Sequence, residues 1–413
     1  MDIKKVNQIL NDNAYTRTGG TAEELKCAEY IKAAAAELTG YEAHIEDFEV
    51  DMSTMNKAVL IVDGKEIPCK GYLCSGNADI EAPFYYMPSD DKHSLAACKG
   101  KIVMIDSSMS YWKYQDILEK GAVGFITYDG NANYADEDID QKELRKAVSN
   151  GNKIPGVCIN AKQAIALVRD GATTAKIILD QEEYVGTSRN VVLDIPGEIE
   201  DTIVVTAHYD STSLSLGSYD NMSGSIGLLG IAEHFAKAPH RYSLRFVWCG
   251  SEERGLLGSK AYVAAHEDEL SKFVLNVNLD MIGCIMGGFA ACCTCEDKLV
   301  TFIEYLSYLE GFPLKVWQDV YSSDSTPFAD KGVPAVSFAR HAPQNTATIH
   351  NRYDTVAVMK AEHVLKDIDF INAFIAHMAN AKNFPVAREI PANVKDKLDV
   401  YLNRKRGGGG RPF

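Results

Sequence analysis

Four short aliphatic runs, each followed by imidazole or carboxylate side chains, constrain this chain more than any other feature of its sequence. The runs are Ile203–Ala207, Leu244–Cys249, Val274–Leu279 and Ala335–Phe338. Such runs are typical of parallel strands that are buried on both faces. Helical patterns lie between them, for example in residues 223–237 and 256–266. We therefore predict an α/β domain whose mixed, mostly parallel sheet is sandwiched by helices.

The polar residues after these runs are all of types that bind metal ions. In chain order they are His208, Asp210, Asp220, Glu252, Glu253, Asp280, His350 and Asp354. Because open α/β sheets place their sites at the carboxyl ends of the strands, we expect these side chains to meet at one edge. Imidazole and carboxylate donors suit divalent zinc, manganese or cobalt. Two imidazoles and three or more carboxylates exceed what one four-coordinate ion needs and fit two ions that share a bridging carboxylate.

Each of these residues also has an ordinary structural interpretation. An isolated aspartate is more often a helix cap or a turn former, and the adjacent pair Glu252 and Glu253 is more often solvated. His208 alone would fit a hydrogen-bonded loop. Their joint placement at four strand ends favours the metal site. Because neighbouring side chains at a strand end point in different directions, one glutamate can bind metal while the other takes a proton from water.

The segment from about residue 55 to residue 180 has a different sequence pattern. Short strand-like runs alternate with acidic and Gly/Asn-rich loops, and one helix is expected over Tyr111–Lys120. It contains no obvious cluster of ligand residues, so we do not expect the chemistry there. We predict a discontinuous catalytic domain of residues 1–52 and 188–385, an inserted β-rich domain of residues 53–187, and a flexible tail over residues 386–413. The tail holds one weak helical stretch, Val394–Asn403, and four consecutive glycines.

Five segments resemble, in the same order, the motifs of a known enzyme family. They are Val205–Ser211, Asp220–Gly224, Ser251–Ser259, Leu279–Gly283 and Ile349–Thr355. Together they are similar to the co-catalytic di-zinc exopeptidases of the aminopeptidase and glutamate carboxypeptidase-like family. The likeness extends over residues 17–31 and 190–384. The inserted unit resembles a protease-associated (PA) domain through Lys101–Asp106, Lys120–Tyr128 and Ile154–Ile159.

The resemblance implies a role for each motif residue. His208 and Asp280 would bind one ion, Glu253 and His350 the other, and Asp220 would bridge the two. Glu252 would be the general base. Asp210 would orient His208, and Asp354 would support the loop at His350. Tyr321 is a candidate oxyanion helper, and Arg340 is a candidate ligand for a substrate carboxylate. Where many relatives carry His after Ser-Asp, this chain has Ser323-Asp324-Ser325, which bears on specificity rather than on catalysis.

The family also implies the reaction and the cofactor. We expect a metal-dependent aminopeptidase with two divalent ions, zinc in the first place and manganese or cobalt as alternatives. A metal-bridging hydroxide would attack peptide substrates that carry a free N-terminus. The competing hypotheses are a dipeptidase or carboxypeptidase on the same fold, a cyclotransferase with one zinc, and a non-catalytic binding relative. The last would have lost ligands, and none of the five is missing here.

The composition indicates which binding partners and which cellular location are expected. The net charge of −15 argues against a nucleic-acid partner, because an acidic surface repels phosphates. No run approaches the roughly 18 apolar residues of a membrane span, and no apolar signal segment is visible, so we expect a cytoplasmic protein without a membrane partner. The ten cysteines lack the spacing of a disulfide framework. The cluster Cys292, Cys293 and Cys295 could bind a soft metal, but ordinary thiols are the favoured interpretation.

Overall fold

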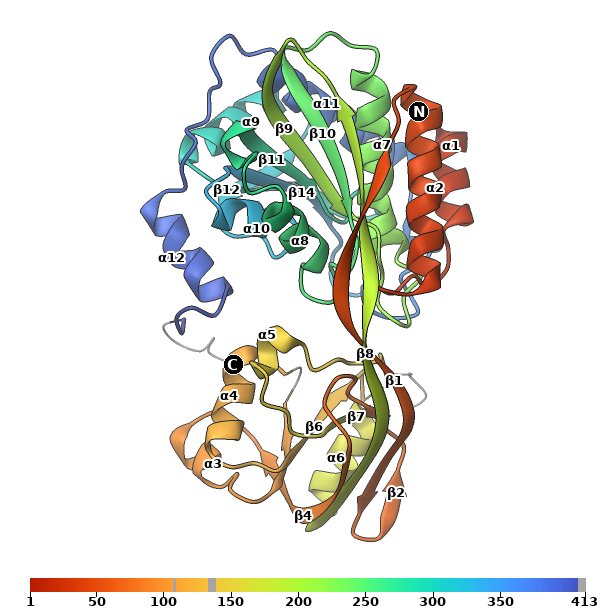
Figure 1. Cartoon of the computed structure of the whole chain (residues 1–413), viewed down its shortest axis with the longest axis vertical. Helices are drawn as coiled ribbons and strands as arrows, with labels where there is room; N and C mark the ends of the chain where they lie inside the picture. The colour runs from red at the N-terminus through yellow and green to blue at the C-terminus, as the bar shows by residue number, and fades with distance from the viewer. Residues whose placement is uncertain (107–108, 133–138, 408–413) are drawn as a thin grey trace. The chain divides into compact units, whose positions relative to one another are not determined.

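The computed structural model describes residues 1–106, 109–132 and 139–407, and the chain divides into two compact units. Unit 1 comprises Met1–Val50 and Thr187–Phe413, and unit 2 comprises Asp51–Gly186. The boundaries fall inside two long strands, β1 (His44–Val62) and β8 (Thr174–Ile195), which are labelled in Figure 1. Unit 1 is therefore discontinuous in sequence, and unit 2 is an insertion into it.

Unit 1 is built on a mixed sheet with the order β13-β12-β14-β11-β9-β10-β8. The central strands β14, β11, β9 and β10 run parallel to one another, whereas β12 is antiparallel to β14 and β8 is antiparallel to β10. The mostly parallel α/β sheet predicted from the sequence is confirmed. The strands are β9 (Ile199–His208), β10 (Tyr242–Cys249), β11 (Phe273–Leu279), β12 (Gly288–Thr294), β13 (Leu314–Gln318) and β14 (Ala335–His341).

Helices cover both faces of this sheet. On one face they are α1 (Ile3–Asp12), α2 (Ala22–Thr39), α7 (Ser223–Phe235), α9 (Asp297–Leu309) and α11 (Ala361–Ala379), which share the main core with the sheet. On the other face they are α8 (Leu257–Ala265), α10 (Ser325–Asp330) and α12 (Ala392–Tyr401), whose buried side chains form two smaller apolar clusters. Figure 1 shows α1, α2 and α7 on the opposite side of the sheet from α8 and α10.

Local sequence signals explain where the site-bearing helices lie. The Thr21 hydroxyl caps α2 by accepting the backbone N–H of Glu24, and Gly40 ends the helix with a left-handed φ of 76°. The glycines of α7 let it approach the sheet closely, since a Cβ on Gly227 would lie 2.5 Å from the Leu279 side chain. This close approach brings the start of α7, and with it Asp220, to the carboxyl end of β11.

The C-terminal segment differs in part from the flexible tail that the sequence predicts. Ile390, Val394 and Leu398 are buried against Ala329 and Ala335, so α12 is packed onto α10. The weak helical stretch expected over Val394–Asn403 corresponds to α12, but its packing was not predicted, because the three apolar positions stand at four-residue spacing in an otherwise polar segment. Residues 408–413, which include the last three of the four glycines, lie outside the described residues.

Unit 2 has its own strands and its own cores. The strands β4, β5, β6 and β7 are parallel neighbours, β3 pairs antiparallel with β7, and β8 pairs antiparallel with β4. The bounds are β2 (Lys65–Ile67), β3 (Lys70–Gly71), β4 (Ala78–Met87), β5 (Ile102–Ile105), β6 (Gly124–Asp129), β7 (Gly156–Asn160), α3 (Lys92–Ala96), α4 (Tyr111–Glu119), α5 (Lys146–Ser149) and α6 (Ala161–Arg169). The helix expected over Tyr111–Lys120 is α4.

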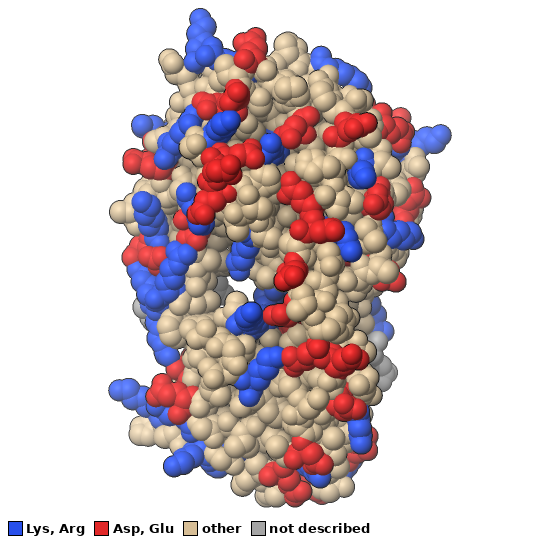
Figure 2. Space-filling view, viewed as in Figure 1, with Lys and Arg blue, Asp and Glu red and all other residues tan. Residues whose placement is uncertain are grey.

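The next observations concern the charge on the surface, the helices and the cysteine thiols. Acidic and basic side chains are interspersed on the face that Figure 2 shows. Across the described ranges, no helix has both the length and the apolar character needed to cross a membrane. All ten cysteines are free thiols, and nine of them are buried.

Candidate metal centre

The predicted ligands lie at the carboxyl ends of neighbouring strands of unit 1. His208 is the last residue of β9, and Asp280 directly follows β11, its neighbour in the sheet. Glu252 and Glu253 follow β10, whose Cys249 stands opposite His208 in the parallel register. Asp220 lies in the segment Ser218–Met222 that leads into α7, where its φ of −111° and ψ of 91° form a non-helical kink. The structure places these residues at one edge of the sheet.

The side chains form two groups that share Asp220. His208 Nε2 lies 3.1 Å from Asp220 Oδ1 and 3.6 Å from Asp280 Oδ1. His350 Nε2 lies 3.1 Å from Asp220 Oδ2 and 3.0 Å from Glu253 Oε2. Within each group, one ligand atom from each residue lies within 4.8 Å of the others. The two oxygens of Asp220 thus face different imidazoles, which is the arrangement that a bridging carboxylate needs.

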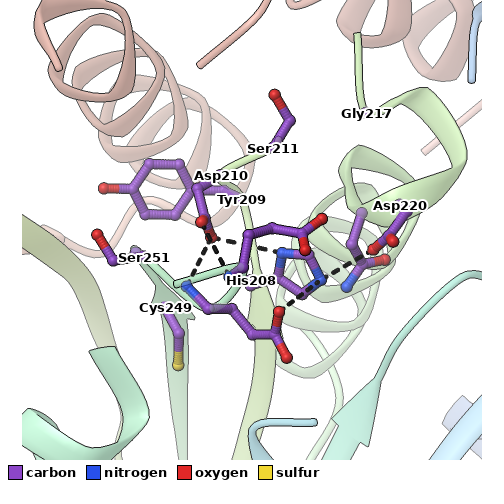
Figure 3. A network of polar contacts seen from close by, with 12 residues as sticks. His208, Tyr209, Asp210, Ser211, Gly217, Asp220, Cys249 and Ser251 are labelled. Carbon is purple, nitrogen blue, oxygen red and sulfur yellow. Dashed lines mark hydrogen bonds and ion pairs between the residues drawn. The ribbon is translucent and has the colours of Figure 1, made fainter. Parts of the chain in front are cut away.

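Asp210 connects both sides of this centre. Its Oδ1 lies 3.5 Å from His208 Nδ1, so the Nε2 atom of His208 faces the other carboxylates. Figure 3 shows the His208 imidazole between Asp210 and Asp220. Asp210 also accepts hydrogen bonds from the backbone N–H groups of Glu252, at 2.9 Å, and of Glu253, at 3.2 Å. One buried carboxylate therefore orients an imidazole ligand and the turn that carries both glutamates.

The turn after β10 has an unusual backbone. Ser251 and Leu256 have φ values of 53° and 60°, in the left-handed region that non-glycine residues rarely adopt, and Gly255 has a φ of 112°. Asn190 closes the base of the turn by accepting the N–H of Gly250 and donating to the carbonyl of Gly258. These contacts fix the path of the chain on either side of the two glutamates.

Asp354 holds the segment that carries Asp220. Its carboxylate is fully buried and accepts the backbone N–H groups of Tyr219, at 2.7 Å, and of Asp220, at 3.0 Å. It lies four residues after His350, whose φ of 60° is also left-handed. Asp354 therefore contacts the Asp220 segment through its carboxylate, and its own N–H donates to the Asn351 carbonyl in the loop of His350.

The pKa values of these groups reflect a concentration of negative charge. Burial disfavours a charged His208, yet Glu252 and the hydrogen-bonded carboxylates raise the pKa of His208 well above its usual value. Burial likewise opposes charge on His350, but hydrogen bonds to Asp220 and Glu253 raise the pKa of His350 to about 11. Burial and the Asp220 charge raise the pKa of Glu253 to about 7. The centre therefore favours positive charge among its carboxylates.

The donor set fits divalent metal ions. The Asp280 carboxylate is 5% exposed, and its Oδ1 has no hydrogen-bond partner among the described residues. Such a buried acceptor is costly unless a cation or a water molecule satisfies it. Nitrogen from imidazole and oxygen from carboxylate are donors that zinc accepts, and a buried carboxylate cluster gains from a divalent charge.

Glu252 lies beside the two groups without belonging to either. Its Oε2 is 3.9 Å from His208 Nε2, and its side chain is 12% exposed. Burial raises the pKa of Glu252 well above its usual value, and the neighbouring Glu253 charge adds to this. A carboxylate next to the ligands, with a raised pKa and some access to solvent, has the properties of a general base.

The two substrate-site candidates have different surroundings. The Tyr321 hydroxyl lies 3.4 Å from His341 Nε2, and burial together with the charges of Asp280 and Asp220 raises the pKa of Tyr321. Arg340 instead forms a bidentate ion pair with the buried Asp367 and donates to the carbonyl of Gly287. Its guanidinium is thus bound within the protein.

Two further buried charged residues lie near the centre, of which the sequence pointed to Asp324 only as a specificity position and gave Arg17 no role. Asp324 is fully buried beside His208, Asp280 and Asp210, and burial raises the pKa of Asp324 to about 6. Arg17 is fully buried beneath the segment after His208. No local pattern could have identified Arg17, because four of its hydrogen-bonding contacts lie 192 to 200 residues away in sequence. The thiols of Cys292, Cys293 and Cys295 are buried as well and lie outside both ligand groups.

Comparison with family models agrees with this geometry. Residues 190–374 match the model of peptidase family M28, and residues 47–167 match that of the PA domain. Residues 190–374 therefore belong to peptidase family M28. The M28 match contains the five predicted ligand positions and Glu252, and the family resemblance stated from the five motifs is confirmed.

Individual relatives and solved structures match nearly the whole chain. Aminopeptidase YwaD from Bacillus subtilis (strain 168) is 27% identical over 92% of this chain and 85% of its own length. The solved structure of BSAP, a zinc aminopeptidase from Bacillus subtilis, superposes with a TM-score of 0.76 at 25% identity, covering 95% of this chain and 98% of BSAP. An aminopeptidase from Aneurinibacillus sp. strain AM-1 shares the fold, with a TM-score of 0.77 at 23% identity over 94% of this chain and 96% of that one.

Proposed function

We propose that this protein is a zinc-dependent aminopeptidase that removes N-terminal residues from peptides. The observation that carries the proposal is the pair of ligand groups joined by Asp220, with Glu252 beside them. His208 and Asp280 would hold one ion, and Glu253 and His350 the other. The M28 and PA matches and the names of the relatives support this assignment.

In this proposal, separate residues of the chain act in proton transfer, in ligand orientation and in stabilisation of the oxyanion. When bound, zinc ions lower the pKa of water and polarise the scissile carbonyl. Glu252 accepts the proton of the attacking water and later delivers it to the leaving amine. Asp210 keeps the backbone of Glu252 in place and holds the imidazole of His208 with Nε2 toward the centre. Tyr321, whose raised pKa keeps its phenol protonated, donates a hydrogen bond to the developing oxyanion.

The choice of an aminopeptidase over a carboxypeptidase has a structural argument. A carboxypeptidase needs a cation for the terminal carboxylate of its substrate, and Arg340 is the sequence candidate for that role. The Asp367 carboxylate already binds the Arg340 guanidinium through two nitrogens. The centre itself is rich in carboxylates, which suits a substrate with a free ammonium group.

The test combines metal content with substrate form. The purified protein is stripped with a chelator, reloaded with zinc, and assayed with aminoacyl substrates in matched free-amine and Nα-acetyl forms. We expect two zinc ions per chain, no activity after stripping, and hydrolysis of the free-amine form only. Cleavage of acetylated peptides with a free C-terminus would indicate the carboxypeptidase alternative. Failure to bind zinc, cobalt or manganese would contradict the proposal.

A further inference from the structure

Arg17 is among the largest fully buried side chains of the protein, and it lies outside every motif of the metal centre. Within the described residues its guanidinium makes no ion pair. All five of its side-chain hydrogen bonds go to backbone carbonyls. A buried guanidinium that binds only carbonyls holds several chain segments together, because its planar fork has five donors in fixed directions.

Three of these carbonyls belong to the segment between two predicted ligands. Arg17 donates to the carbonyl of Leu216 at 2.5 Å, to that of Gly217 at 2.6 Å, and to that of Tyr209. The other two carbonyls, of Asn13 and Tyr15, belong to its own neighbourhood. Residues 209–217 connect His208 to the Asp220 turn, so Arg17 contacts both ends of this connection.

The backbone of Arg17 binds the same segment. Its N–H donates to Ser211 Oγ at 3.1 Å, and its carbonyl accepts the N–H of Ser211 at 3.4 Å. The packing is tight, since a Cβ on Gly217 would lie 2.8 Å from Arg17 Nη2. Ser211 Oγ in turn donates to the carbonyl of Ser215, which joins the middle of the segment to the same contact.

The buried carboxylate of Asp354 binds the other end of the segment that Arg17 contacts. It accepts the N–H groups of Tyr219 and Asp220, and Ser215 Oγ lies 3.3 Å from one of its oxygens. Carbonyls of the connection between His208 and Asp220 therefore bind a buried cation, while N–H groups at its end bind a buried anion. This division leaves the backbone little freedom to change the separation of the two ligands.

We propose that Arg17 is a positioning residue of the metal centre, which fixes residues 209–217 and thereby the spacing between His208 and Asp220. The inference rests on the proposed metal site. Lysine cannot replace arginine here, because a single ammonium group has three donors on one atom and cannot reach carbonyls from three directions.

The test compares Arg17→Lys and Arg17→Met with Arg245→Lys. Arg245 is a matched control, because it is also a mostly buried arginine of unit 1 but pairs with Asp194 and Glu269 away from the ligands. Zinc affinity is measured by competition with a chromogenic chelator, and backbone mobility by hydrogen exchange of residues 209–217. Both Arg17 variants should bind zinc about 10–100-fold more weakly, with faster exchange in this segment. Arg245→Lys should retain wild-type affinity.

Ser211→Ala provides a milder variant if the Arg17 variants do not fold. It removes one hydrogen bond to the Arg17 backbone and should weaken zinc binding in the same direction by a smaller factor. Unchanged zinc affinity and unchanged exchange in a folded variant would overturn the inference. If the wild-type protein binds no metal, the proposed function fails, and the exchange of residues 209–217 alone then decides whether Arg17 holds this segment.

Discussion

The Asp210 carboxylate accepts the backbone N–H of Glu252 at 2.9 Å, although the two residues lie 42 positions apart in sequence. Its other oxygen accepts the N–H of Glu253 at 3.2 Å. Asp210 follows β9 and the glutamates follow β10, so this contact joins two neighbouring strand ends across the centre. It links the orientation of an imidazole ligand to the position of the proposed general base.

Replacing Asp210 should therefore affect two functions together. In Asp210→Asn, the side-chain amide offers one acceptor oxygen, so one of the two backbone N–H groups loses its partner. We expect zinc affinity and kcat each to fall about 10–100-fold, as is usual when a residue that supports metal ligands is changed. Competition with a chelator and steady-state kinetics measure the two effects. A loss of kcat at full zinc affinity would show that Asp210 acts on Glu252 alone.

Glu252→Gln separates metal binding from proton transfer. The amide cannot accept the proton of water, so kcat should fall by about 10²–10⁴-fold while the zinc content stays unchanged. Mass spectrometry of the metal-loaded protein and kinetics with a free-amine substrate provide the two readouts. Glu267→Gln is the control, because Glu267 lies on the surface and pairs with Lys331. Activity that survives in Glu252→Gln would exclude its role as general base.

Zinc binding should depend steeply on pH. Hydrogen bonds to carboxylates overcome burial and raise the pKa of His350 to about 11, and the pKa of His208 is raised as well, so both imidazoles of the stripped protein carry protons at neutral pH. Zinc binds the neutral imidazole and must displace these protons. The apparent affinity should therefore increase as the pH rises from neutrality toward about 11, the pKa of His350. Calorimetry in buffers of different ionisation enthalpy measures the proton release, and binding without it would contradict the prediction.

The free energy of unfolding of the metal-free protein should decrease as the pH rises, whereas its zinc affinity increases. The pKa of His350 is higher in the folded state than the value near 6.5 of an unfolded chain. Its contribution to the free energy of unfolding is therefore fully present below about pH 6.5 and is lost as the pH rises toward 11. His350→Gln should flatten this part of the stability curve, as measured by urea unfolding of the stripped protein at several pH values.

The packing of α12 can be tested by two substitutions on one helix. Leu398 is 3% exposed and contacts the α10 region, whereas Lys395 on the same helix is exposed. Leu398→Ala should lower the free energy of unfolding by about 2–5 kcal/mol, and Lys395→Ala by less than about 0.5 kcal/mol. Equal effects of the two substitutions would support the flexible tail that the sequence predicts.

Much of the unit 1 fold follows from local patterns. The four aliphatic runs correspond to β9, β10, β11 and β14, because buried parallel strands need continuous apolar side chains. The runs also revealed the ligand positions, since parallel strands end at one edge of the sheet. The strand β12 was missed, because Gly288–Thr294 contains alanine and cysteine in place of β-branched residues.

The contacts that hold the site could not be predicted in the same way. The role of Arg17 depends on carbonyl oxygens, and every residue has a carbonyl, so no side-chain pattern marks its partners. The same holds for Asp354, whose partners are the backbone N–H groups of Tyr219 and Asp220. Residue types indicate which side chains are candidates to bind a metal. The folded backbone is needed to show that Arg17 and Asp354 fix the distance between the segments that carry these candidates.

The discontinuous course of unit 1 has a consequence for how this protein can evolve. The five proposed ligands and Glu252 all belong to unit 1, and the chain leaves and re-enters that unit within β1 and β8. Because unit 2 contributes none of these six residues, substitutions on its surface leave their identities unchanged. The short stretch around Arg17 is under the opposite constraint, because each substitution there is transmitted to the metal-binding loops.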